Sequence, residues 1–373
     1  MSGGTGIVGR IMEKRVSWGI LATGGIARAF AGGVARSKTG SVVAVGSRSV
    51  EGAEKFAREM GVPRAHGSYE ALLADPEVEA VYIATPHPQH AEWIVKAARA
   101  GKHVLCEKPL AMTRDEAARA AEACQAAGVM LMEAFMYRCH PQTAKIVEIV
   151  RSGAIGRVGL VQATFSFSTA FDPKNRFFSK ELGGGGILDV GCYPVSLARL
   201  VAGADVGKAF LDPAQVTGAV RWHPETGVDA WAAATLEFAS GMIAQVSCGV
   251  ALAQDNCARI YGTDGWLHVP EPWVPGREGG AVRMYLKRGD ATEEIAVETG
   301  EWLYGLEADA FGAALKAGWK EVPQMTVADT LGNMGVLDAW RDCPGAGRER
   351  TAGRDADGLR RRYAPAGTGP RRS

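Results

Sequence analysis

A glycine-containing turn follows the first apolar run of the chain, within Trp18–Ala27. Ala22, Gly24 and Ala27 stand where a dinucleotide-binding turn has the three glycines of Gly-x-Gly-x-x-Gly. Gly24 would let the backbone approach a pyrophosphate, and a helix that starts after the turn would offer free N–H groups. We therefore predict a nucleotide site that includes Ala22, Thr23, Gly24, Gly25 and Ile26.

The end of the second apolar run indicates which nucleotide is bound. Ser47 and Arg48 lie where an NAD-binding domain places an acidic residue on the ribose hydroxyls, about 20 residues after the glycine turn. A hydroxyl and a guanidinium instead suit a 2′-phosphate, and Arg48 can also stack on adenine. The dipeptide alone is equally typical of a surface loop. Together with the turn it favours NADP, with NAD as the alternative.

Two later apolar runs end in residues that can move protons or contact a cofactor. Both ends fall at the carboxyl edge of the expected sheet, where ligands of open α/β folds bind. Burial and a neighbouring nicotinamide cation would lower the pKa of Lys108 and free it for proton transfer. His87 and His90 have a spacing that metal sites use, but no third ligand is evident and we predict no metal. The further cofactor contacts expected here are Thr85, Pro86, His87, His90, Glu107 and Lys108 itself.

A second reactive pair stands in the middle of the chain. Asp189 and Tyr193 are four residues apart and share one face if the segment is helical. Tyr193 could exchange a proton with a carbonyl or carbinol oxygen, while Asp189 holds the substrate or its partner. Gly183–Gly186 would let the chain enter the helix beside a ligand, and Pro194 should bend or break it. The alternative is a helix contact with a capping Asp.

The elements that position these residues fall into two groups. Residues 16–134 alternate apolar runs with segments of helical period, which predicts a doubly wound parallel sheet with helices on both faces. After about residue 140, several strand-like segments follow one another, which indicates an antiparallel sheet. The strands expected first are Val16–Leu21, Ser41–Ser47, Ala80–Thr85, His103–Lys108 and Val129–Ala134, and the later ones are Arg157–Thr169, Gln215–Trp222, Ala230–Phe238, Met242–Val250 and Cys257–Tyr261.

We predict four parts: a leader at residues 1–15, a Rossmann domain at 16–138, an α+β domain at 139–341, and a tail at 342–373. The helices expected in the α+β domain are Ile187–Val201, Glu307–Ala317 and Ala328–Arg341. The tail is rich in Arg and Gly. A nucleic-acid tail would have this composition, but a solvated, poorly ordered terminus is the interpretation we favour.

Composition excludes several classes of protein. The 42 basic and 41 acidic side chains give a net charge of +1, which provides no electrostatic drive toward nucleic acid or an anionic membrane. No apolar run reaches the roughly 18 residues that span a bilayer. The seven cysteines form no Cys-x-x-Cys pair, so we expect reduced thiols and a cytoplasmic protein.

Taken in order, these pieces resemble the Gfo/Idh/MocA family of pyridine-nucleotide oxidoreductases. Within it, the sequence is most similar to the branch that holds dimeric dihydrodiol dehydrogenases and NADP-dependent xylose dehydrogenases. The matching pieces span about residues 16–341 and are Gly19–Ala27, Thr85–His90, Glu107–Pro109, Glu133–Pro141, Gly183–Tyr193 and Thr330–Arg341.

The resemblance implies a Rossmann domain followed by a domain with a large, mostly antiparallel sheet, through which members form dimers or tetramers. It implies that Lys108 is catalytic or orients the substrate, with Pro109 often cis, and that Asp189 and Tyr193 form the Asp-x-x-x-Tyr motif. It also places Arg138 in the lining of the cofactor and substrate cleft. Ala22 and His87 depart from the pattern, where glycine and asparagine are usual.

The expected activity is NADP-dependent hydride transfer between nicotinamide C4 and a carbinol or carbonyl carbon of a sugar, polyol or cyclic diol. Tyr193 would be the acid/base, and Lys108 would hold the same oxygen and lower the tyrosine's pKa. Specificity would come from loops such as Phe165–Phe178 and Gln254–Asn256. The alternatives are an NAD-dependent glycosidase of the same fold that uses transient oxidation, and a non-catalytic NADP-binding sensor.

Overall fold

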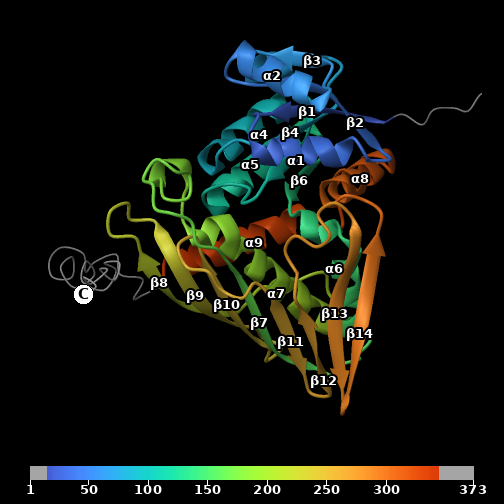
Figure 1. The fold of residues 1–373 in the computed structure, drawn as a ribbon, viewed down its shortest axis with the longest axis vertical. Helices are drawn as coiled ribbons and strands as arrows, with labels where there is room; N and C mark the ends of the chain where they lie inside the picture. The colour runs from blue at the N-terminus through green and yellow to red at the C-terminus, as the bar shows by residue number, and fades with distance from the viewer. Residues whose placement is uncertain (1–14, 344–373) are drawn as a thin grey trace, which may run out of the picture.

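The computed structural model describes residues 15–343 (Figure 1). Most residues of the predicted leader and tail lie outside this range. Its first domain contains a six-stranded parallel sheet with strand order β3-β2-β1-β4-β5-β6. This order confirms the doubly wound α/β prediction, because β2 and β3 lie on one side of β1 and β4 to β6 lie on the other, so the order in which strands are added reverses between β1 and β4. The strands are β1 (Val16–Leu21), β2 (Gly40–Gly46), β3 (Arg64–His66), β4 (Ala80–Ile83), β5 (His103–Glu107) and β6 (Leu131–Ala134).

Helices on both faces of this sheet begin and end at residues that cap them. In α2 (Val50–Met60), the Ser49 side chain accepts the Gly52 N–H, and Gly61 ends the helix with a φ of 68°. Thr113 and Gly128 act in the same way on α5 (Arg114–Ala127). The short β3 and α3 (Tyr69–Leu73) have too few residues to show a period and were not predicted. The other helices here are α1 (Gly25–Val34) and α4 (His90–Arg99).

The second domain is built on an eight-stranded sheet with strand order β14-β13-β12-β11-β7-β10-β9-β8. Only the β7–β10 pair is parallel, so the prediction of a mostly antiparallel sheet is confirmed. The three strands β12 to β14 were missed. The strands are β7 (Val158–Ser166), β8 (Gln215–Trp222), β9 (Asp229–Glu237), β10 (Ile243–Gly249), β11 (Ala258–Gly262), β12 (Gly265–Val269), β13 (Gly280–Arg288) and β14 (Ala291–Thr299).

The helix expected at Ile187–Val201 differs from the prediction. It begins with a π-helical turn, η4 (Ile187–Gly191), and continues as α7 (Cys192–Asp205). Pro194 does not break it, because it lies in the first turn of α7, where a missing N–H costs little. The segment Lys180–Asp205 is long and apolar enough to cross a membrane, yet its most apolar stretch of 18 residues is entirely buried inside the fold, as in a core helix.

Two late helices return to the first domain and fix the arrangement of the two sheets. Figure 1 shows α8 (Leu303–Lys316) beside α1, and the backbones meet so closely that a Cβ on Gly33 would lie 2.6 Å from the Gly305 nitrogen. The last helix, α9 (Val327–Arg341), packs against both α5 and α7. One continuous apolar core therefore joins both domains. The remaining helix of the second domain is α6 (Pro141–Arg151).

Candidate active site

A cavity of about 750 Å³ lies where the carboxyl ends of β1, β2, β4 and β5 face the second domain. In open α/β sheets this edge is where ligands bind. The first domain lines it with Ala22, Thr23, Gly24, Gly25, Ile26, Ser47, Arg48, Tyr69, Ala84, Thr85, Pro86, His87, Gln89, Glu107, Lys108 and Met136. The second domain adds Phe165, Phe167, Arg176, Phe177, Leu182, Asp189, Val190, Tyr193, Val274, Arg277 and Tyr304.

The glycine turn offers an anion site at one end of this cavity. Gly24 and Gly25 are exposed, and a Cβ on either would meet no atom within 4 Å. The helix α1 starts at Gly25 with no side-chain cap and no acidic residue in its first turn, so its N–H groups remain available. Arg28 donates a hydrogen bond to the Thr23 carbonyl and steadies the turn. This arrangement fits a pyrophosphate group.

The departure from the glycine pattern at Ala22 has a structural consequence. Ala22 has a φ of 86°, a backbone conformation that favours glycine, and it is the one described non-glycine residue with a positive φ. Its N–H donates to the Gly46 carbonyl, which ties the turn to the end of β2. Ser47 and exposed Arg48 follow directly and line the cavity edge. The predicted phosphate-binding pair therefore lies beside the turn.

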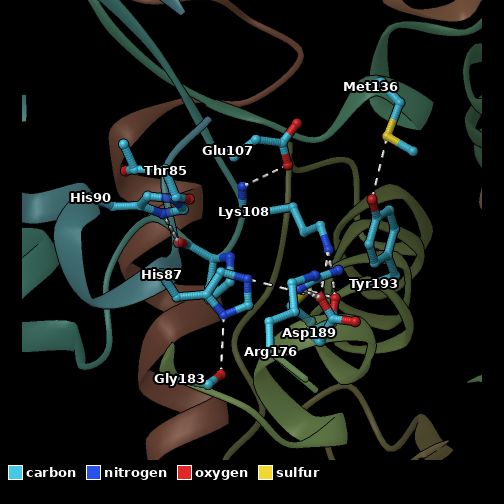
Figure 2. A network of polar contacts seen from close by, with 12 residues as sticks. Thr85, His87, His90, Glu107, Lys108, Met136, Arg176, Gly183, Asp189 and Tyr193 are labelled. Carbon is cyan, nitrogen blue, oxygen red and sulfur yellow. Dashed lines mark hydrogen bonds and ion pairs between the residues drawn. The ribbon is translucent and has the colours of Figure 1, made fainter. Parts of the chain in front are cut away.

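Lys108 reaches across the cavity to the second domain (Figure 2). Its Nζ donates to the backbone carbonyl of Asp189 at 2.6 Å, lies 3.6 Å from Asp189 Oδ1, and lies 5.0 Å from the centre of the Tyr193 ring. Burial lowers the pKa of Lys108, but nearby acidic groups, Asp189 foremost with Cys192 and Glu107, together raise it by more, so the pKa lies above its ordinary value. The expectation of a lowered pKa is wrong, because the sequence does not show how closely these groups surround the ammonium. Lys108 is therefore an ammonium group at neutral pH.

Asp189 is the centre of a cluster of cationic and polar groups. Its Oδ1 accepts a hydrogen bond from Arg176 at 3.0 Å and lies 3.8 Å from His87 Nε2. Burial raises the pKa of Asp189, but Lys108, Arg176 and His87 together lower it to about 2. Burial lowers the pKa of His87 to about 3, so its ring is neutral, and its Nδ1 lies 3.2 Å from the Gly183 carbonyl oxygen. Asp189 is therefore a carboxylate at neutral pH.

Tyr193 lines the cavity, and its hydroxyl points toward Met136 in an aromatic surrounding (Figure 2). The hydroxyl lies 3.4 Å from Met136 Sδ, and the ring centre lies 5.1 Å from those of Phe135 and Phe165. Burial raises the pKa of Tyr193 well above its ordinary value, and nearby acidic groups such as Glu107 raise it further. The expected lowering by Lys108 is thus wrong. The phenol is protonated at neutral pH and therefore carries the proton that a carbonyl reduction needs.

The carboxylate of Glu107 accepts two hydrogen bonds that hold the turn carrying Lys108. Glu107 accepts a hydrogen bond from the Tyr82 hydroxyl through Oε1, and the Lys108 N–H donates to Oε2 at 3.2 Å. The peptide bond between Lys108 and Pro109 is cis. Burial raises the pKa of Glu107. These contacts fix the backbone from which the Lys108 side chain extends.

Three predicted positions lie outside the cavity. His90 is fully buried, and its two ring nitrogens each lie 2.8 Å from a backbone carbonyl oxygen, of Thr85 and of Pro109. Arg138 is buried and donates to Asp329 at 2.7 Å and Ser196 at 3.0 Å, so its placement in the cleft lining is wrong. His90 supports the backbone and Arg138 joins side chains of α7 and α9, and neither residue lines the cavity. The loop Gln254–Asn256 is also absent from the lining and bonds to β7 and β10.

The second domain supplies cavity residues that sequence reasoning did not single out. Arg176 lies inside the loop Phe165–Phe178, to which specificity was assigned without naming a residue. Arg277 and Tyr304 come from the β12–β13 connection and the start of α8, where no motif marks them. Within residues 15–343, no three His, Cys, Asp or Glu side chains gather in a way that could hold a metal ion.

Comparisons with known proteins agree with this geometry. The profile described as "Oxidoreductase family, NAD-binding Rossmann fold" matches residues 16–135, and that of the GFO/IDH/MocA C-terminal domain matches residues 143–268. A D-xylose 1-dehydrogenase (NADP⁺) from Haloferax volcanii is 36% identical over 86% of this chain and 95% of its own. A trans-1,2-dihydrobenzene-1,2-diol dehydrogenase from Mus musculus is 35% identical over 69% of this chain and 75% of its own.

Solved structures give the same assignment. A 3-ketoreductase from Actinomadura kijaniata in complex with TDP-benzene and NADP superposes with a TM-score of 0.78. It is 28% identical, and the match covers 88% of this chain and 98% of that one. The order of the parallel sheet, the mostly antiparallel second sheet and the two matched profiles lead to one conclusion. The chain belongs to the GFO/IDH/MocA family of oxidoreductases, whose Rossmann domain binds NAD-type cofactors.

Proposed function

We propose that this oxidoreductase is NADP-dependent and transfers hydride between nicotinamide C4 and a carbinol or carbonyl carbon of a sugar, polyol or cyclic diol. The observation that carries the proposal is the meeting of Lys108, Asp189 and Tyr193 in the same cavity as the glycine turn. Relatives named for D-xylose and for a cyclic diol support the substrate class.

The charge states in the cavity assign a role to each polar group. The Lys108 ammonium has three N–H donors, of which one bonds to the Asp189 carbonyl oxygen. We infer that another donates to the substrate oxygen, while the ionised Asp189 keeps Lys108 protonated. The protonated Tyr193 phenol gives its proton to the same oxygen during carbonyl reduction and takes one back during carbinol oxidation. Fixed positive charge at that oxygen stabilises the charge that develops there.

The residues at the other end of the cavity would hold the cofactor. The free N–H groups of α1 and the open Gly24–Gly25 backbone suit the pyrophosphate, and Ser47 with Arg48 suits a 2′-phosphate. When bound, the nicotinamide ring supplies or accepts the hydride. The NADP-dependent relatives support this choice over NAD.

The test is turnover by Lys108→Met and Tyr193→Phe with NADP and its reduced form across pentoses, hexoses and cyclic diols. We expect each variant to lose roughly 100- to 10,000-fold in kcat, the range attributed to general acid–base catalysis. NADP affinity, measured by calorimetry, should remain unchanged. Lys145→Met and Tyr261→Phe change the same residue types outside the cavity and should behave like the unmodified protein.

Two results would contradict the proposal. Full turnover by both cavity variants would show that Lys108 and Tyr193 do no chemistry. Release of the aglycone from aryl glycosides without net consumption of cofactor would instead identify a glycosidase that uses transient oxidation.

We also propose that the protein forms a homodimer or homotetramer through the second sheet. The middle of that sheet carries short polar and small side chains on its exposed face, with Gln162 bonded to Gln245 and Thr164 to Ser247. An exposed sheet face of this composition suits a second copy of the chain. Sedimentation at micromolar concentration should give a dimer or tetramer, and a monomer would contradict the proposal.

A further inference from the structure

A buried acid outside the cavity begins the strand β9. Asp229 is 4% exposed, and its Oδ2 accepts the backbone N–H of Ile187, the first residue of η4. Burial raises the pKa of Asp229 to about 7, and the amides of Ile187 and Gly186 act against burial. A carboxylate on a strand thus accepts a hydrogen bond from the start of a helix that lies 42 residues earlier in the chain.

The start of this helix needs such a partner. The first N–H groups of any helix lack carbonyl partners within it, and side chains near the start usually accept them. Here the residue before η4 is Gly186, which has no side chain to offer. A negative charge at a helix N-terminus is also favourable. Asp229 therefore provides from a distant strand what the local sequence does not.

The glycines before η4 make this contact possible. A Cβ on Gly185, which has a φ of 116°, would lie 2.1 Å from Asp229 Oδ1. A Cβ on Gly186 would lie 2.9 Å from the Cα of Gly249 on β10. Any side chain at either position would push the segment away from the second sheet. The absence of side chains at these glycines thus allows the Asp229 carboxylate to approach the backbone.

The position of η4 sets the geometry of the reactive groups. Asp189 lies two residues after Ile187, and Lys108 bonds to its backbone carbonyl oxygen as well as facing its carboxylate (Figure 2). A displacement of the turn would therefore move both contacts together. Tyr193 follows in the first turn of α7 and would move with them. π-helical turns of this kind occur frequently at functional sites.

We propose that Asp229 is a positioning residue that anchors the π-helical turn to the second sheet, so that Asp189 and Tyr193 face Lys108. The catalytic part of this inference rests on the proposed function. Asp229 touches neither substrate nor cofactor in this scheme, because it does not line the cavity.

The test compares Asp229→Ala and Asp229→Asn with Glu237→Gln, an exposed carboxylate at the other end of the same strand. Three quantities are measured: kcat and KM, the Kd for NADP by calorimetry, and hydrogen–deuterium exchange of residues 184–193. Asp229→Ala should lose up to about 100-fold in kcat, the scale expected for misplacement by 1 Å. Its exchange should become faster within 184–193 alone, with the Kd for NADP unchanged. Asp229→Asn keeps one acceptor oxygen and should recover most of kcat.

Each outcome decides the proposal. Wild-type kcat per NADP-binding site in Asp229→Ala would overturn it, as would unchanged exchange in 184–193. If Asp229→Ala does not fold, Asp229→Leu, which fills the same space but has no acceptor oxygen, decides, and wild-type kcat and exchange in that variant would overturn the proposal. If the unmodified protein turns over no sugar or diol, the proposed function fails, and the exchange measurement alone decides whether Asp229 anchors the turn.

Discussion

The two ends of the cavity are built in different ways. The cofactor end uses consecutive residues directly after β1 and β2, and its main features are exposed backbone and absent side chains at Gly24 and Gly25. The substrate end uses side chains that come together from widely separated segments, and most of them are buried or half-buried. Its polar groups are Lys108, Arg176 and Asp189, and its walls include Phe165, Phe167 and Phe177.

The two ends of the cavity therefore depend on the rest of the fold to different degrees. A turn between a strand and a helix forms an anion site from local backbone geometry alone. The substrate end depends on charge states that only the assembled fold establishes. Lys108 is protonated because Asp189 lies beside it, and Asp189 is ionised because Lys108 and Arg176 surround it. Substitutions should therefore act locally at the cofactor end and spread through neighbours at the substrate end.

Apart from the variants of Lys108, Tyr193 and Asp229, the largest effect is expected at the cofactor end, from Arg48→Ala. Loss of a charge-assisted contact to a 2′-phosphate should weaken NADP binding roughly 10- to 100-fold. Binding of NAD and kcat at saturating NADP should stay the same, because Arg48 lies at the exposed edge of the cavity. Calorimetric titration with both cofactors measures this. Equal weakening for NADP and NAD would show that Arg48 does not recognise the phosphate.

At the substrate end, Arg176→Leu should lower kcat/KM about tenfold, the effect of one lost hydrogen bond to a charged group. The pKa of Asp189 should rise from about 2, because one of its cationic neighbours is gone. The acid limb of the pH–rate profile should move to higher pH by the same amount. Arg176→Lys retains the charge and should keep most of that limb in place. If the acid limb of the pH–rate profile does not shift in Arg176→Leu, Arg176 does not lower the pKa of Asp189.

The same contrast explains how much of the molecule the sequence predicts. Segments of helical period predict helices at Val50–Met60 and Arg114–Ala127, which are the bounds of α2 and α5, and capping side chains and glycines mark the ends of both. The residues of the glycine turn and Lys108 were found because they follow buried strands. Arg138 was misplaced because the sequence does not show Asp329, its partner 191 residues away. Arg277 and Tyr304 were missed because the packing of distant loops brings them to the cavity.

A smaller effect is expected where the two domains meet. Glu307 on α8 is fully buried, both of its carboxyl oxygens lack a partner, and burial raises its pKa well above the ordinary 4.5. The folded protein thus keeps this proton at pH values where the unfolded chain releases it. This group should therefore reduce the free energy of unfolding by up to roughly 1 kcal/mol per pH unit above pH 4.5.

Glu307→Gln removes this titration. Urea unfolding at pH 5 and pH 8 should show a stability gain for the variant that grows as the pH rises. The exposed Glu298→Gln is the matched control and should show no such growth. A constant difference between Glu307→Gln and the unmodified protein at both pH values would contradict a proton held on Glu307.

The smallest effect is expected at Ala22, again at the cofactor end. An alanine at a φ of 86° is strained by about 1–2 kcal/mol, and glycine relieves this but gives back about 0.5–1 kcal/mol in chain entropy. Ala22→Gly should thus raise the free energy of unfolding by about 1 kcal/mol or less. Gly61→Ala, at a φ of 68° with open space around it, should shift Tm in the opposite direction. A lower Tm for Ala22→Gly would mean that the Ala22 methyl group makes packing contacts worth more than the strain. Both substitutions change only local backbone strain and chain entropy, so kcat should not change in either variant.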